Sequence, residues 1–113
     1  MNLQHKSLHV CVAVRELVKE IYTVSKLLPA EERFNMVSQI RRAALSVKLN
    51  LAEGASRRSD GERNRYYEIC RGSVVEIDAA LETAVDLAYF KIEQLQTSGE
   101  LLNKCFAMLS NLM

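Results

Sequence analysis

The chain has 113 residues, of which 49% are hydrophobic and 26% are charged, and its formal net charge is +1. This length indicates a single domain spanning residues 1–113, and no apolar run approaches the roughly 20 residues that cross a bilayer. The N-terminus also lacks the basic stretch, apolar segment and cleavage site of a secretory signal. We therefore expect a cytoplasmic protein without a membrane partner.

The first predicted helix covers about residues 8–28. Its apolar stripe includes Cys11, Val14, Val18 and Ile21, which recur at the spacing of three or four residues that places side chains on one helix face. One face of this helix is therefore expected to pack in a core.

The second predicted helix covers about residues 30–57. Pro29 marks its start, because a proline is harmless in the first turn of a helix, where its missing N–H has no intrahelical partner. From Val37 to Leu51 the apolar residues again recur at spacings of three and four. Such a seam is typical of helices that pack nearly antiparallel in a bundle.

The third predicted helix covers about residues 60–89. Ser59 and Glu62 have the spacing of a capping box, in which each side chain accepts a hydrogen bond from the other residue's backbone N–H. Tyr66 begins the apolar seam of this helix and is expected in the core. The rest of the seam is rich in small residues, so we expect a neighbouring helix to approach closely.

The fourth predicted helix covers about residues 92–112, follows a tight turn, and is weakened by Gly99. No segment has the alternating pattern of a strand. The four helices together predict an all-α fold, an antiparallel up-down-up-down four-helix bundle.

The three cysteines, Cys11, Cys70 and Cys105, lie on the apolar stripes of different predicted helices. Their odd number and wide spacing, without a CxxC motif, argue against a disulfide framework. We expect buried, reduced thiols, which agrees with a cytoplasmic protein.

Positive charge is concentrated in the middle of the chain. Residues 41–71 carry a net charge of +4, whereas the remainder carries a net charge of −3. Such a cluster suits the phosphates of RNA or DNA, and Tyr66 and Tyr67 suit stacking on unpaired bases. A solubilising helix turn is the alternative interpretation. The candidate nucleic-acid-binding residues are Arg41, Lys48, Arg57, Arg58, Arg63, Arg65 and Arg71.

A polar stripe accompanies the apolar seam of the second predicted helix. It is either a solvated face or a surface that packs against the third helix. Within it, Glu53 lies four residues before Arg57, the favourable orientation for an ion pair on a helix. The residues that we assign to helix–helix architecture are Arg42, Ser46, Asn50, Glu53, Gly54, Gly72, Ser73 and Glu76.

Antiparallel pairing about a turn near residue 58 gives these residues expected partners. Arg42 falls opposite Glu76, which predicts an ion pair between the two helices. Ser46 falls opposite Gly72, where a missing side chain permits close approach of the backbones.

The chain resembles the 23S ribosomal RNA intervening-sequence protein family in the runs PAEERFNMVSQIRRAALSVKLNLAEGASR and YYEICRGSVVEIDAALETAVDLAYF. The resemblance spans about residues 8–110 and implies a small bacterial four-helix bundle. Related accessory variability proteins of diversity-generating retroelements form pentameric barrels that bind nucleic acid and a reverse transcriptase. The resemblance therefore implies a homo-oligomer, a pentamer in those relatives, that associates with nucleic acid. The matching residues are Pro29, Glu32, Phe34, Gln39, Arg41, Arg42, Ala43, Ser46, Asn50, Leu51, Ala52, Glu53, Gly54, Gly72, Ser73, Glu76 and Tyr89.

Metal and enzyme chemistry find little support in the sequence. His5 and His9 lie four residues apart, but no third ligand is near them, so we expect no metal site. Asp78, Glu82 and Asp86 form an acidic stripe without a histidine or reactive thiol. There is no phosphate-cradling glycine loop either. We expect no catalytic residues and no cofactor.

The chain has more apolar residues than one core seam needs, and an assembly would bury the excess. Two functions remain open. One is a homo-oligomer that binds RNA through the basic hairpin of the second and third helices. The other is an oligomeric adaptor whose main ligand is another protein, by analogy a reverse transcriptase. The apolar residues off the main stripes are Val10, Val12, Leu45, Leu49, Val75 and Val85.

Overall fold

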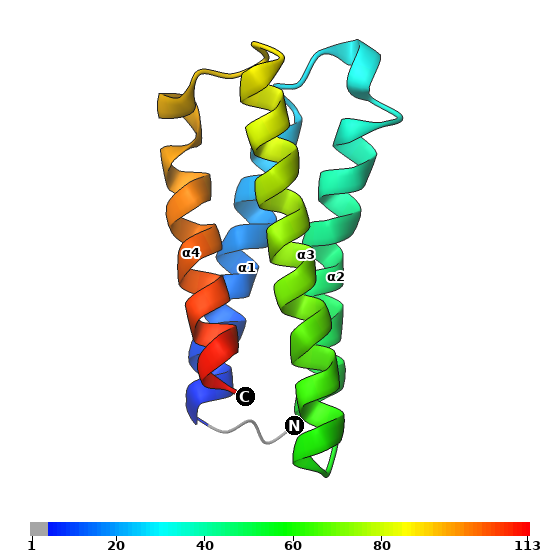
Figure 1. Cartoon of the computed structure of the whole chain (residues 1–113), viewed down its shortest axis with the longest axis vertical. Coiled ribbons are helices and arrows are strands. Elements are labelled where there is room, and N and C mark those ends of the chain that lie inside the picture. The colour runs from blue at the N-terminus through cyan, green and yellow to red at the C-terminus, as the bar shows by residue number, and fades with distance from the viewer. Residues whose placement is uncertain (1–4) are drawn as a thin grey trace.

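The computed structural model describes residues 5–113, and this part of the chain folds into four long helices without a strand (Figure 1). The predicted all-α four-helix bundle is confirmed. The helices are α1 (His5–Ser25), α2 (Met36–Ala55), α3 (Asp60–Asp86) and α4 (Gln96–Asn111), and short 3-10 helices η1 (Ala30–Glu32) and η2 (Ile92–Leu95) precede α2 and α4.

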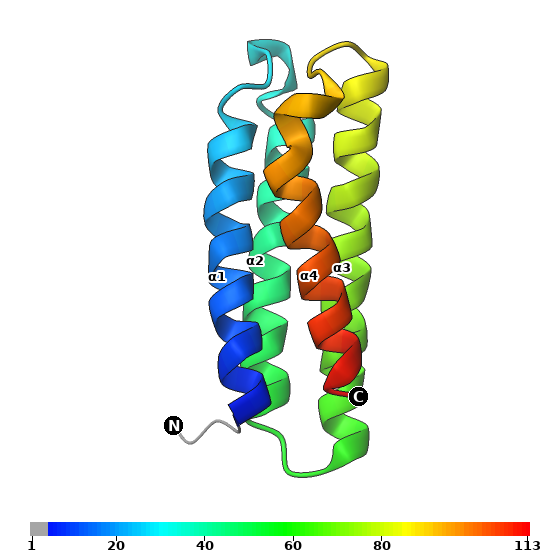
Figure 2. The same ribbon diagram turned by 90° about the vertical axis from the view of Figure 1, so that its left-hand side faces the viewer.

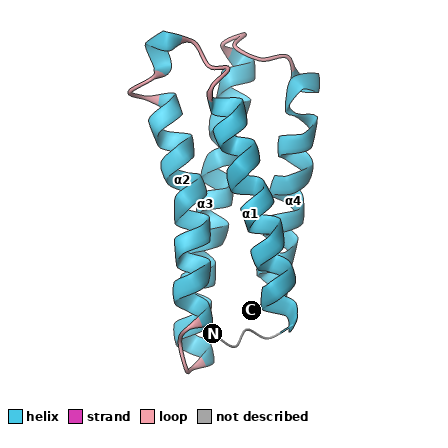
Figure 3. Cartoon of the chain, turned by 180° about the vertical axis from the view of Figure 1, so that it is seen from behind, coloured by secondary structure: helices cyan, strands magenta, loops and turns pink. Residues whose placement is uncertain are grey.

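The helices run up, down, up and down in a bundle of 44 × 25 × 20 Å (Figure 2). Each packs against its neighbours in the chain, and α4 also packs against α1, which closes the four-cornered arrangement. The α2–α3 turn lies at the end of the bundle where α1 begins and α4 ends, while the other two connections lie at the opposite end (Figure 3). We call the α2–α3 turn with its flanking helix ends the tip, and the opposite end the far end. No helix in the described part combines the length and apolar character that a bilayer crossing requires.

The core is formed by large aliphatic side chains that all four helices direct inward. Leu17, Ile40, Ile77 and Leu109 are fully buried, one from each helix. Val10, which the sequence placed off the main stripes, is buried as well. Cys70 and Cys105 are buried as predicted, whereas Cys11 is only partly buried because it lies at the edge of the α1 stripe.

The prediction that Tyr66 enters the core is wrong. Tyr67 takes that position with 3% of its surface exposed, and Tyr66 is half-buried. The buried face of α3 passes through Tyr67, Val74 and Leu81, each seven residues or two turns from the next. Tyr66 and Tyr67 lie four and three residues before Cys70, and both spacings fit one helix face, so the sequence pattern could not decide between them.

The second helix begins at Met36 and not at residue 30, because the intervening segment makes a separate short helix and a turn. The carboxylate of Glu32 accepts hydrogen bonds from the Asn35 side chain at 3.1 Å, the Met36 backbone N–H at 3.4 Å and the Tyr89 hydroxyl at 2.8 Å. These bonds hold the chain in a turn and tie it to the end of α3. Phe34, within the turn, is 88% exposed.

The third helix ends at Asp86, three residues earlier than predicted, in a Schellman motif. The N–H of Tyr89 donates to the Ala84 carbonyl and that of Ala88 to the Val85 carbonyl, both at 2.9 Å. Ala88 has φ = 62°, a left-handed conformation that usually requires glycine. Because alanine and not glycine occupies this position, the sequence pattern does not indicate the helix end.

The α2–α3 interface corrects two of the predicted residue pairs. The hydroxyl of Ser46 accepts a hydrogen bond at 2.9 Å from Ser73 rather than packing on Gly72. Gly72 is exposed, and a Cβ added there would meet nothing within 4 Å. Arg42 and Glu76 are both exposed and form no ion pair in the described structure, because both lie on outward faces of their helices and not in the interface.

The close approach of the two helices occurs instead at Gly54. A Cβ built on Gly54 would lie 2.7 Å from Cε1 of Tyr67 and 3.0 Å from Cβ of Tyr66. The aromatic ring of Tyr67 thus packs on the backbone of α2 near its end. Asn50, one turn before, donates from its side chain to the backbone carbonyl and the hydroxyl of Ser46 and stays within α2.

Candidate nucleic-acid interface

Within the tip, a four-residue connection, residues 56–59, joins the end of α2 to the start of α3. Ser59 caps α3 by accepting a hydrogen bond at 3.2 Å from the N–H of Glu62, so one half of the predicted capping box forms. The side chain of Glu62 returns no bond to Ser59 in the described structure. Arg57 and Arg58 directly follow the carboxyl end of α2, where positive charge is favourable next to the helix macrodipole.

Arg57 is engaged by two neighbours. Its guanidinium donates to the Glu53 carboxylate at 2.8 Å, as predicted, and to the Tyr66 hydroxyl at 3.1 Å. It also lies 5.0 Å from the centre of the Tyr66 ring. Tyr66, and after it Glu53, raise the pKa of Arg57 above its ordinary value. The positive charge of Arg57 is thus compensated locally by Glu53.

Arg63 closes the turn from the other side. Its guanidinium donates to the backbone carbonyls of Arg57 and Arg58, both at 2.9 Å, and forms an ion pair with Asp60. Two backbone carbonyls of the connection between α2 and α3 are thereby satisfied. Arg63 stabilises the connection through these contacts, and its positive charge is paired with Asp60.

Arg41 and Arg71 lie on the seams between helices. Arg41 donates to the Ser25 hydroxyl at 2.7 Å and covers the ring of Tyr22 at 5.1 Å, which fastens α2 to α1. Arg71 pairs with Glu68 at 3.2 Å and covers a ring of α4 at 4.7 Å, while its buried Nε has no partner among the described residues.

The remaining candidates, Lys48, Arg58 and Arg65, are exposed, and their side chains make no hydrogen bond or ion pair with the described part of the chain. We call them the three unpaired cations. Lys48 lies seven residues after Arg41 and so on the side of α2 that faces α1, whereas Arg65 lies on the outer side of α3. The structure therefore distributes them around the tip instead of gathering the whole basic cluster into one patch.

The tyrosines are poorly placed to stack on bases. Tyr67 is buried, and one face of Tyr66 is covered by Arg57.

Arg42, which the sequence assigned to packing, is exposed on the outer side of α2 and adds to the cationic surface. Its position could have been inferred only from the register of the two helices.

Metal and thiol chemistry are limited in the described residues. The side chain of His5 lies outside the described part of the chain, and so does the prediction about the His5–His9 pair. Among the described residues, no group of three potential ligands is close enough to hold a metal ion. Burial raises the pKa of Cys70 to about 12 and that of Cys105 to about 11, so neither forms a nucleophilic thiolate at neutral pH.

Comparison with known proteins supports this architecture. The model of the family described as 23S rRNA-intervening sequence protein matches residues 6–111. A solved structure from Bacteroides thetaiotaomicron, described as a protein with unknown function from the S23 ribosomal protein family, is similar with a TM-score of 0.86. The two chains are 22% identical over 95% of this chain and 96% of the other, a likeness that shows the fold alone. No curated protein shows significant similarity to the sequence.

Proposed function

The chain belongs to the 23S rRNA-intervening sequence protein family, and from its tip we propose that it is a non-enzymatic, self-associating cytoplasmic protein that binds RNA. The observation that carries this proposal is the positive charge left at the tip after the internal pairs have formed. Arg57, Arg63 and Arg71 are each matched by a carboxylate, but the three unpaired cations are not. Glu62 is the one acid of residues 41–71 without an ion pair in the described structure.

A single bundle would hold RNA weakly. Three phosphate contacts on a single strand predict a slope of about −2 for log K against log salt concentration, since each contact contributes roughly −0.7. Several copies that bind one strand together multiply such contacts through high effective concentration. Self-association is therefore part of the proposed function, and a pentamer is the size that the family resemblance implies.

Exposed apolar side chains on the outside of α2 and α3 support self-association. Leu45 and Leu49 lie one turn apart on α2, and both are exposed. Ile69 of α3 is exposed too and precedes Cys70, whose thiol donates to the Val47 carbonyl at 3.3 Å. These contacts set Ile69 at the level of the two leucines. A second copy would bury this patch and leave the tip accessible.

The proposal is tested by a substitution of the three unpaired cations together: Lys48→Gln, Arg58→Gln and Arg65→Gln. The matched control replaces three exposed lysines elsewhere, Lys19, Lys26 and Lys104, by Gln and changes the net charge equally. Binding of a fluorescent single-stranded RNA is measured by anisotropy over a series of salt concentrations. We expect about a tenfold or greater loss of affinity and a shallower salt slope in the tip variant only.

Two results would count against the proposal. Equal weakening in the tip and control variants would indicate attraction by net charge alone. Absence of binding by the wild-type chain at low salt would remove the function altogether.

Light scattering at several protein concentrations tests the assembly separately. A strict monomer, or a Leu49→Glu variant that assembles as the wild type does, would contradict the proposed interface.

A further inference from the structure

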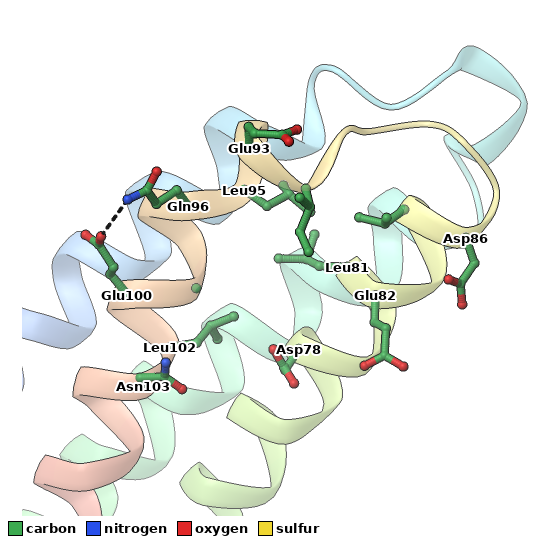
Figure 4. A pocket seen from close by; sticks show the side chains of 13 residues that line it. Asp78, Leu81, Glu82, Asp86, Glu93, Leu95, Gln96, Glu100, Leu102 and Asn103 are labelled. Atoms are coloured by element: carbon green, nitrogen blue, oxygen red, sulfur yellow. Dashed lines mark hydrogen bonds between the residues drawn. The ribbon is translucent and has the colours of Figure 1, made fainter.

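A groove of about 690 Å³ runs between α3 and α4 at the far end of the bundle (Figure 4). Leu81 and Val85 of α3, Leu95 of η2 and Leu102 of α4 contribute apolar side chains to its lining. Its volume is in the range of sites that hold a ligand or several side chains of a partner. The groove lies at the opposite end of α3 from the tip, so it belongs to a separate site.

The groove is open because the side chains of α3 and α4 do not fill the space between these two helices. Gly99 of α4 lines it, and a Cβ added there would meet no atom within 4 Å. Ile92, at one end of the groove, is 71% exposed. A smaller hollow of about 190 Å³ continues between the helices to Val74 and Phe106. From Val74 to Asp86, α3 rises about 18 Å, and a second helix of about three turns would span this length.

All charged side chains that line the groove are acidic. In Figure 4, three carboxylates follow one another along α3, one stands above the groove on η2, and Glu100 points away from α3, where it accepts a hydrogen bond at 3.3 Å from Gln96. None of the five forms an ion pair with a described residue. The carboxylates are Asp78, Glu82, Asp86, Glu93 and Glu100.

This charge is unfavourable for the isolated chain. Residues 76–100 contain six acidic residues and one basic residue, Lys91, a net charge of −5. Asp86 also lies in the last turn of α3, where the partial negative charge of the helix end repels it, and that turn has no basic residue. A cationic ligand would relieve this repulsion, since charges across an interface favour complementary potentials.

We propose that the groove binds a basic amphipathic helix of a partner protein. Apolar side chains on one face of such a helix would fill the space along Leu81 and Leu102. Lys or Arg side chains at its edges would reach Glu82 and Glu93, because their long stems can lie on apolar surface while their charges remain in water. The apolar lining of the groove disfavours a simple cation as the ligand. The five carboxylates, which we call the acidic rim, disfavour nucleic acid because they repel its phosphates.

The probe is a capped synthetic peptide of about 14 residues, enough for nearly four turns, with Leu on one helical face and Lys on the others. Its binding is measured by fluorescence anisotropy at low salt. Gly99→Met places a flexible side chain in the groove and improves helix propensity. It is expected to weaken binding about tenfold or more, because the peptide then loses at least one buried apolar side chain.

The acidic rim is tested with a pair of double variants. Glu82→Gln with Glu93→Gln removes two charges from the groove, and we expect about tenfold weaker binding. Glu16→Gln with Glu76→Gln is the matched control, because both residues are exposed, lie outside the groove and change the net charge equally. The control is expected to change affinity by less than about twofold, in line with the small effects of distant exposed charges. Circular dichroism establishes that every variant is folded.

Four outcomes would overturn the proposal. Equal losses in the two double variants would mean that net charge attracts the peptide. Unchanged binding by Gly99→Met would place the peptide elsewhere. Equally tight binding of a peptide with Glu in place of Lys would remove the role of the rim. Self-association of the peptide-free chain that disappears in the Glu82/Glu93 variant would assign the groove to a second copy. The cation substitutions at the tip are expected to leave the peptide affinity unchanged, so this test is independent of RNA binding.

Discussion

The contact between Gly54 and Tyr67 sets the spacing of α2 and α3 where the tip begins, and substitution of Gly54 by alanine tests this directly. The added Cβ would lie 2.7 Å from Cε1 of the Tyr67 ring. Carbon atoms in contact are normally about 3.5–4.0 Å apart, so the ring or the helix must move by about 1 Å. The ring is only 3% exposed and is enclosed by core side chains, which leaves it little room to yield.

The expected loss of stability follows from two opposing effects. Overpacking of a well-filled interior costs about 1–3 kcal/mol. Alanine is favoured over glycine within a helix by about 1 kcal/mol at most, and less in the last turn where Gly54 lies. The clash is the larger effect. We therefore expect Gly54→Ala to lower the free energy of unfolding by about 1–2 kcal/mol.

The assay is urea unfolding followed by far-UV circular dichroism at one fixed protein concentration, because self-association would otherwise contribute to stability. Gly72→Ala is the matched control within α3, where an added Cβ meets nothing within 4 Å. It is expected to raise stability by about 0.5–1 kcal/mol. In a Tyr67→Ala background, Gly54→Ala is expected to be less destabilising, because only the 3.0 Å contact with Cβ of Tyr66 remains. The difference between the two backgrounds measures the contact with the Tyr67 ring in a double-mutant cycle.

A Gly54→Ala variant as stable as the wild type, alongside a stabilised Gly72→Ala variant, would refute the reasoning. The interface would then tolerate a side chain at Gly54, and the close approach of the two helices would not depend on glycine. A destabilisation that persists unchanged in the Tyr67→Ala background would equally place its cause outside this contact.

Three further predictions concern the helix ends and the thiols. Ala88→Gly is expected to stabilise the chain by about 0.5–1 kcal/mol, because it removes left-handed strain of about 1–2 kcal/mol and adds a smaller entropy to the unfolded state; urea unfolding measures this. The Tyr89 hydroxyl lowers the pKa of Glu32 below its ordinary value of 4.5, so this bond stabilises the fold above that pH and is lost as the pH falls through the folded-state pKa. Tyr89→Phe is accordingly expected to lower the melting temperature at neutral pH and to reduce its dependence on acid, and an unchanged acid profile would contradict this. Cys70 and Cys105, with pKa values raised by burial to about 12 and about 11, are expected to react with iodoacetamide only when the chain unfolds, which mass spectrometry of labelled peptides detects.

The sequence predicts the four helices well because their apolar spacing is a local signal. It fails at the start of α2 because the decisive contact is not local. Glu32 is held by the Tyr89 hydroxyl, 57 residues away, and this bond favours a turn where the composition favours a continuing helix. The end of α3 was missed for a related reason, since Ala88 adopts a conformation that composition assigns to glycine.

The sequence predicts where positive charge is concentrated along the chain, but it predicts only some of the ion pairs that decide which charges remain exposed. Spacing along α2 identified the pair of Glu53 with Arg57. It could not show that Arg63 folds back onto the carbonyls of the turn, because that contact depends on a side-chain direction set by the three-dimensional path of the connection. The Arg42–Glu76 pair did not form although Ser46 meets Ser73 close to the predicted register, because both side chains lie on exposed faces of their helices.

Several residues that match the family pattern hold helices together, and this limits what the pattern says about ligands. Gly54 accommodates Tyr67, and Glu32 binds Tyr89, so these positions are constrained by packing whatever the protein binds. The side chains of the three unpaired cations make no hydrogen bond or ion pair on which the described fold depends. Their substitution is therefore expected to leave the free energy of unfolding within about 0.5 kcal/mol of the wild type. Loss of RNA binding in such a variant would then report on the interface itself, because the bundle that presents it would be unchanged.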